Sequence, residues 1–177
     1  MEEQKIINLI RKSYEAGNLD YILSYVDKHY WYKVLKSALS NVTVDNITDF
    51  SYSKCFSIYL YPDNKGEFGI GSEELKNYIN KNKNFICINL LVSAIAPFAV
   101  IKYNRFYFSD GESMLHEQYE PLDEETLLLG NKVKEVLSKH RINLLDEDIL
   151  NIEIPNLSLD LKEEGVTVYH CLFEDSY

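Results

Sequence analysis

Residues 85–108 decide the fold, and they read FICINLLVSAIAPFAVIKYNRFYF. Residues 85–92 are apolar at nearly every position, which is typical of a strand covered on both faces. Residues 98–108 predict a second strong strand. Pro97 has no N–H to contribute to a ladder, so we expect it in the connection between the two strands or at an edge.

An alternating pattern precedes this pair. Residues 54–61 place apolar side chains at every second position, which predicts a strand with one face turned inward. Residues 62–66 read Pro-Asp-Asn-Lys-Gly, a dense turn signal. We expect residues 67–70 to return from this turn as a short partner strand.

Strand patterns resume after residue 108. Residues 109–112 read Ser-Asp-Gly-Glu, a hairpin signal, so residues 113–119 are predicted to pair back onto residues 103–108. Residues 165–173 read GVTVYHCLF and are predicted to form the last strand of the chain.

Helical periodicity marks the remaining segments. Apolar residues three and four positions apart predict helices, and capping or stop residues mark several of their boundaries. The predicted helices cover residues 6–16, residues 19–39 with a break near Lys28 and His29, residues 73–79 after the capping Ser72, residues 124–140 after the capping Asp123, and residues 147–152 after Asp146.

These elements predict the α+β class, with a mixed or mainly antiparallel sheet of about five to six strands covered by N-terminal and C-terminal helices. A single domain is expected for 177 residues of which 46% are hydrophobic. Within it we expect a helical N-terminal part at residues 1–40, main strands with one helix at residues 50–119, and acidic helices with the final strand at residues 122–177.

Charge is distributed unevenly along the chain, whose net charge is −10. Residues 110–177 hold 17 Asp and Glu against 5 Lys and Arg, a balance of −12, whereas residues 1–109 have a balance of +2. Such a field repels nucleic acid and anionic lipid and attracts basic partners, so we expect a protein partner with a basic surface and no nucleic-acid ligand. The longest uncharged run, residues 85–101, is shorter than the roughly 20 apolar residues of a spanning helix, so no membrane insertion is expected.

The residue patterns indicate no cofactor and no metal site. The three cysteines lie far apart without a CxxC pair, which predicts buried, reduced thiols in a cytoplasmic protein. His29, His116 and His140 stand in no metal-ligand spacing. The Met-Glu-Glu start lacks the pattern of a signal peptide.

Two groups of residues form the predicted interface. Tyrosine, with 14 residues, offers a rigid apolar ring with a polar tip and is enriched at protein interfaces, although packing beneath helices is an alternative for these rings. The aromatic candidates are Tyr30, Trp31, Tyr32, Tyr59 and Tyr61. The acidic candidates, which we expect to gather into one docking surface, are Asp110, Glu112, Glu117, Glu120, Asp146, Asp148, Glu174 and Asp175.

Three stretches resemble small bacterial proteins of the toxin-immunity type. They are the aromatic residues 30–32, the segment 91–99 (LVSAIAPFA) and the ending 165–175 (GVTVYHCLFED). The resemblance implies a bacterial protein that covers a cognate toxin and carries no catalytic residues, and no functional residue is carried over from it.

We therefore expect a non-catalytic binding protein, such as an immunity protein that neutralises a basic nuclease toxin. One alternative is an enzyme with its site near His116 or His170. Cys171 invites a nucleophile–base pair with His170, but neighbours on a strand point to opposite faces. A second alternative is a homo-oligomer built by the apolar strands 85–92 or 98–108.

Overall fold

The computed structural model describes residues 3–15, 17, 19 and 23–174. Its strands form one six-stranded sheet, in which β1 to β5 follow one another in chain order and pair antiparallel, while β6 pairs parallel with β4. The predicted α+β class with a mainly antiparallel sheet is confirmed. The strands are β1 (Val42–Asn46), β2 (Cys55–Pro62), β3 (Asn84–Ser93), β4 (Phe98–Ser109), β5 (Glu112–Gln118) and β6 (Asn143–Leu144).

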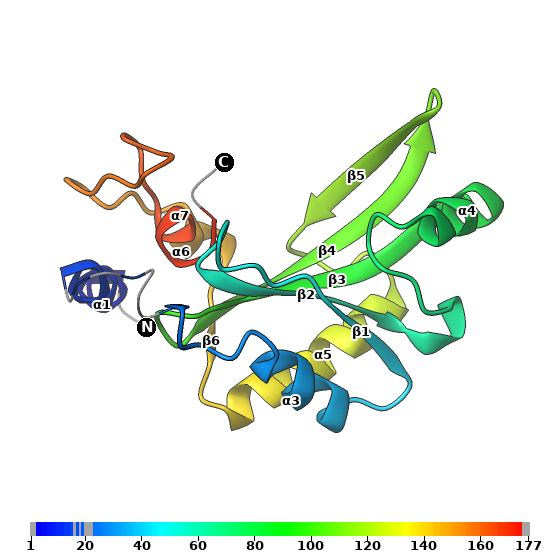
Figure 1. Cartoon of the computed structure of the whole chain (residues 1–177), viewed down its shortest axis with the longest axis horizontal. Helices are drawn as coiled ribbons and strands as arrows, with labels where there is room; N and C mark the ends of the chain where they lie inside the picture. Colours follow the sequence, from blue (N-terminus) through cyan, green and yellow to red (C-terminus); the bar gives the residue numbers. More distant parts are fainter. Residues whose placement is uncertain (1–2, 16, 18, 20–22, 175–177) are drawn as a thin grey trace.

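Helices cover both faces of this sheet (Figure 1). α3 and α5 lie on one face, whereas α4 covers one end of the other face and α1, α6 and α7 cover its opposite end. None of the helices in the described part of the chain is long and apolar enough to cross a membrane. They are α1 (Glu3–Glu15), α3 (Tyr30–Ala38), α4 (Glu73–Asn82), α5 (Glu124–Lys139), α6 (Glu147–Leu150) and α7 (Val168–Leu172), with a 3-10 turn, η1 (Asp63–Lys65).

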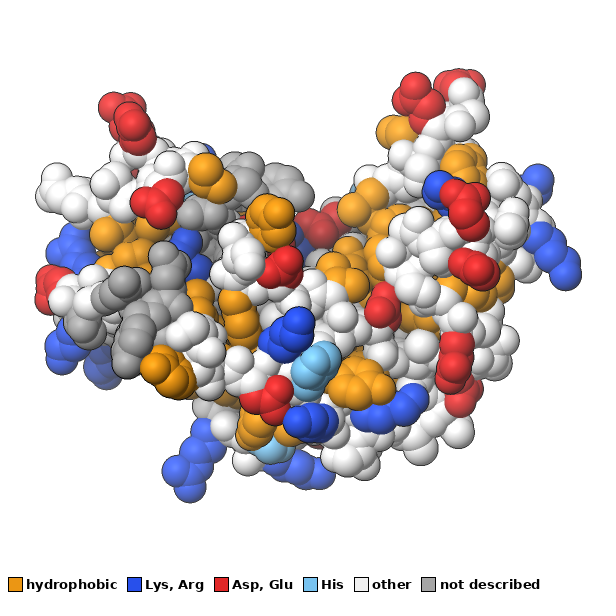
Figure 2. Space-filling view, viewed as in Figure 1, with side chains coloured by type: hydrophobic (Ala, Val, Ile, Leu, Met, Phe, Trp, Pro, Cys, Tyr) orange, Lys and Arg blue, Asp and Glu red, His pale blue; other side chains and the backbone are white. Residues whose placement is uncertain are grey.

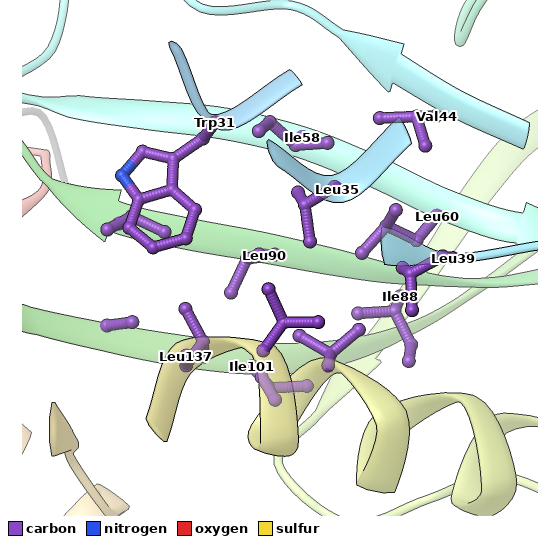
Figure 3. Packing of buried hydrophobic residues seen from close by; sticks show 14 of the residues in the cluster. Trp31, Leu35, Leu39, Val44, Ile58, Leu60, Ile88, Leu90, Ile101 and Leu137 are labelled. Carbon is purple, nitrogen blue, oxygen red and sulfur yellow. The ribbon is translucent and has the colours of Figure 1, made fainter. Parts of the chain in front are cut away.

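The face beneath α3 and α5 carries a continuous hydrophobic core (Figure 3). Every second residue of the central strands points into it, so Ile58, Ile88 and Leu90 are fully buried. Trp31 of α3 and Leu137 of α5 close over these strands from the two helices.

Polar residues divide the opposite face into two hydrophobic clusters. Leu91 belongs to the cluster under α1 and α7, and Phe85 belongs to the cluster under α4. Between the clusters lie Asn89 and Lys102, which are partners in the β3–β4 register and are each 8% exposed. β3 is therefore covered on both faces, as its sequence predicts.

Two local predictions are confirmed in detail. Asp110 and Gly111 have φ values of 52° and 84°, which are the left-handed values of a two-residue hairpin turn, and β5 pairs back onto β4 from this turn. Asp123 caps α5, because its carboxylate accepts a hydrogen bond of 2.7 Å from the backbone N–H of Thr126.

The predicted last strand, residues 165–173, is wrong, because Val168–Leu172 form the helix α7. Thr167 and His170 form a capping box at its start, in which the Thr167 N–H donates to Nδ1 of His170 at 3.0 Å. The segment is apolar at most positions, and a short apolar run of this kind is compatible with a buried strand or a buried helix.

One further expectation differs from the structure, and another is found in two parts. Residues 67–70 form no strand. The side of β2 where we expected them is occupied by β1, which was not predicted and whose first residue, Val42, pairs with Pro62. The helix expected over residues 19–39, with a break near Lys28 and His29, is helical at residues 19 and 23 and continues as α3 from Tyr30, after turns at residues 24–25 and 28–29 and a bend at residue 26. Residues 20–22 of that prediction lie outside the described residues.

We predict that Leu90→Ala destabilises the protein by about 2–5 kcal/mol, because it leaves a cavity in a fully buried site between the sheet and its helices. Urea unfolding followed by circular dichroism measures this change. Leu161→Ala is the matched control, because this leucine is 69% exposed and its truncation should leave the free energy of unfolding within about 0.5 kcal/mol. Equal effects of the two substitutions would contradict the packing described above.

Candidate functional site

A gap along one edge of β4 forms a concave site. β6 pairs with β4 at Phe98 and Ala99, and β5 pairs with it from Tyr103 onward, so within the described chain residues 100–102 have no strand partner on this edge. A cavity of about 770 Å³ opens here, and we call it the acidic notch. Its lining residues are Ile101, Tyr103, Glu117, Gln118, Tyr119, Glu120, Lys134, Leu144, Leu145, Asp146, Glu147 and Asp148.

The floor of the acidic notch includes the backbone of β4. The N–H groups of Asn143 and Leu145 donate to the carbonyls of Pro97 and Ala99 at 3.0 and 2.9 Å, so these carbonyls point toward this edge. Backbone groups of alternate residues in a strand point the same way, and the N–H and C=O of Ile101 therefore face the notch.

Two segments far apart in sequence form the acidic walls. Residues 117–120 span the last two residues of β5 and the bend that follows it, and residues 146–148 begin α6. The carboxylate of Asp146 caps α6 by accepting a hydrogen bond of 3.0 Å from the Ile149 N–H, which fixes the first turn of that helix beside the sheet. Five carboxylates thus share the notch with the ammonium group of Lys134.

A buried cation lies behind one wall of the notch. The Lys102 ammonium donates to Oε1 of Glu117 at 2.8 Å and to the Tyr169 hydroxyl at 2.9 Å, and its side chain is only 10% exposed. Burial first, and then the nearby charge of Glu174, raise the pKa of Tyr169, so its phenol stays protonated and donates to Oε2 of Glu174 at 3.0 Å. This chain of bonds holds Glu117 in place and joins β4 to α7.

The structure brings together half of the predicted acidic residues. Four of the eight line the acidic notch: Glu117, Glu120, Asp146 and Asp148. Glu147 and Lys134 also line it and were not predicted, although the run at residues 146–148 marks Glu147 in the sequence. The gathering of the acids into one surface is therefore partial.

The other predicted acidic residues lie elsewhere. Asp110 and Glu112 occupy the tip of the β4–β5 hairpin, where acidic side chains project at the upper right of Figure 2. Four residues of β5 separate Glu112 at this tip from Glu117 in the notch, a distance of about 17 Å along the strand. Glu174 bonds to Tyr169, and Asp175 lies outside the described residues.

The structure buries most of the predicted aromatic interface. Three of the five rings are core residues with little exposure: Trp31 (4%), Tyr59 (8%) and Tyr61 (0%). The Tyr61 hydroxyl is satisfied internally, because it donates to the Phe68 carbonyl at 2.7 Å. Tyr30 is 46% exposed and Tyr32 is half-buried, and both lie on α3, which packs beside β1 and α5.

The structure also places the residues considered for an enzyme site and for a homo-oligomer. His116 is exposed on β5 and lies 3.0 Å from the Gln118 amide oxygen, whereas His170 serves the cap of α7. Cys171 is fully buried, and its carbonyl accepts a hydrogen bond of 2.7 Å from the Tyr14 hydroxyl. The strands proposed for a homo-oligomer, β3 and β4, lie inside the sheet, so they do not present a free face for that contact.

Among the described residues, no group of three or more His, Cys, Asp or Glu side chains is arranged to hold a metal ion. No protein-family model matches this chain, and no curated protein or solved structure matches it either. The geometry of the acidic notch is therefore the main basis for a functional proposal.

We predict that the three thiols do not react with Ellman's reagent at about pH 8 while the protein is folded. Burial raises the pKa of Cys55 and of Cys171 to about 12 and also raises the pKa of Cys87, so the reactive thiolate is absent from the folded state. In guanidinium chloride all three should react at once. Rapid modification of a thiol in the folded protein would show that its site opens to solvent. It would then support the alternative in which that cysteine is a nucleophile.

Proposed function

We propose that this chain is a non-catalytic binding protein whose acidic notch receives a basic surface of a partner protein. The observation that supports this function is the convergence of residues 117–120 and 146–148, from two separate segments, on one cavity at the sheet edge. A solvated acidic face would not require that convergence.

Electrostatics makes the acidic notch suited to cationic side chains. Five carboxylates and one lysine surround a single concavity, so their fields add over distances comparable to the Debye length of about 8 Å at physiological salt. Such a field speeds the encounter with a basic partner and disfavours acidic ones. Lys or Arg side chains that enter the notch would form charge-assisted hydrogen bonds with its walls.

Neutralisation of a nuclease toxin is the form of this function that the immunity-type resemblance supports. Nucleases hold the phosphate backbone with basic side chains, and an acidic protein that covers those side chains competes with the nucleic acid. A typical interface buries about 800 Å² on each partner, which is a small share of the 10140 Å² accessible surface of this chain.

The test compares two triple variants that change the net charge equally. Glu120→Gln, Glu147→Gln and Asp148→Asn alter exposed acids of the notch, whereas the control triple variant changes exposed acids outside it: Asp160→Asn, Glu163→Gln and Glu164→Gln. We expect the notch variant to bind an octalysine peptide, or the product of the adjacent gene, about ten-fold more weakly at low salt. The control should change the affinity by less than about two-fold.

Titration followed by NMR or calorimetry measures these affinities, and circular dichroism checks that both variants fold. If the two variants weaken binding equally, the acids act only through the overall charge, and the notch is not the binding site. Loss of binding in neither variant would contradict the proposal directly.

A further inference from the structure

β5 is an edge strand with one side open. In the described part of the chain it pairs only with β4, and its residues 112–117 are all exposed. Figure 1 shows the β4–β5 hairpin extending from the body of the sheet, with β5 on its outer side. An open strand edge is a template for pairing with another extended segment.

The backbone direction on β4 identifies which groups of β5 face outward. Odd-numbered residues of β4 point their N–H and C=O toward β5, because the carbonyls of Pro97 and Ala99 point toward β6 on the same edge and the β3–β4 register is unbroken. The β5 residues opposite them are even-numbered: Glu112, Met114, His116 and Gln118. The N–H and C=O groups of Ser113, Leu115 and Glu117 therefore point away from β4.

β5 lacks most of the devices that protect an edge strand. It contains no proline and no lysine, and its register with β4 runs without a bulge from the hairpin turn to Gln118. Two of its apolar side chains are substantially exposed, Met114 at 40% and Leu115 at 49%. Apolar side chains beside open backbone groups are what an added strand would cover.

The charge around this edge selects the chemistry of the added strand. Residues 106–131 contain seven Asp and Glu and no Lys or Arg. A second copy of this chain would bring the same negative charge to the edge, whereas a basic segment would neutralise it. The end of β5 leads directly into the acidic notch, which Glu117 and Glu120 line.

We infer that the basic partner adds an extended strand to the outer edge of β5, with its backbone bonded to Ser113, Leu115 and Glu117 and its Lys or Arg side chains reaching toward the acidic notch. This inference rests on the proposed function and names how the partner docks. Apolar residues of the added strand would cover Leu115 on one face and Met114 on the other.

The probe is the capped heptapeptide Thr-Lys-Thr-Val-Val-Thr-Lys, whose antiparallel alignment places lysine opposite Glu117 and Glu112 and valine opposite Leu115 and Met114. Titration into the isotope-labelled full chain should shift the amide signals of Ser113, Leu115 and Glu117 saturably and slow their hydrogen exchange. The even-numbered residues of β5 already bond to β4, so their exchange should change less.

Leu115→Pro removes one outward N–H without removing a bond to β4, because proline is tolerated at an edge position whose N–H faces solvent. We expect this variant to bind the heptapeptide at least five-fold more weakly, while Leu115→Val, which keeps the N–H, binds it within two-fold. Both variants should bind octalysine as the unchanged chain does, because the acidic notch is intact.

Three results would overturn this inference. Shifts confined to the notch, with residues 113–117 unmoved, would show that the partner binds there without strand addition and would leave the proposed function standing. Concentration-dependent shifts of residues 113–117 without peptide would show that a second copy occupies the edge. Absence of binding by both peptides would contradict the strand addition and the proposed function together.

Discussion

The structure depends on the burial of β3 and β4 on both faces. Their apolar side chains alternate between the two faces of the sheet, so each strand needs a cover on both sides. α3 and α5 provide the cover on one face with a continuous core around Leu90. On the other face the cover is divided, because α4 and the group of α1, α6 and α7 each reach only one end of the sheet. The polar pair Asn89 and Lys102 lies between these two groups.

That division explains why a charged side chain lies near the middle of the sheet. Lys102 is almost fully buried, and an unpaired ammonium group there would be costly. Its bonds to Glu117 and Tyr169 satisfy it from two directions. The same bonds attach the C-terminal segment to the sheet and hold Glu117 in one acidic wall of the notch. The need to pair the buried Lys102 ammonium therefore also positions part of the candidate site.

The candidate site is a product of sheet geometry more than of any local motif. β5 and β6 both pair with the same edge of β4, one after the other, and the two residues of β6 leave a gap before β5 begins. The carboxylates that line this gap come from the end of β5 and the bend after it, and from the first turn of α6, which follows β6. An edge with open backbone groups and acidic surroundings suits a basic extended segment, whereas Cys171 is fully buried and His170 takes part in the capping box of α7.

The sequence by itself determined the α+β class, the central strands, the hairpin at Asp110 and Gly111 and the cap of α5, because each depends on local periodicity or turn chemistry. It also marked the acidic last third of the chain. Only the tertiary structure decided which acids meet, since residues 117–120 and 146–148 become neighbours through their separate pairing with β4. Tertiary packing likewise buried Trp31, Tyr59 and Tyr61 and made residues 168–172 a helix, because a short apolar run and an aromatic ring are compatible with more than one environment until their neighbours in space are known.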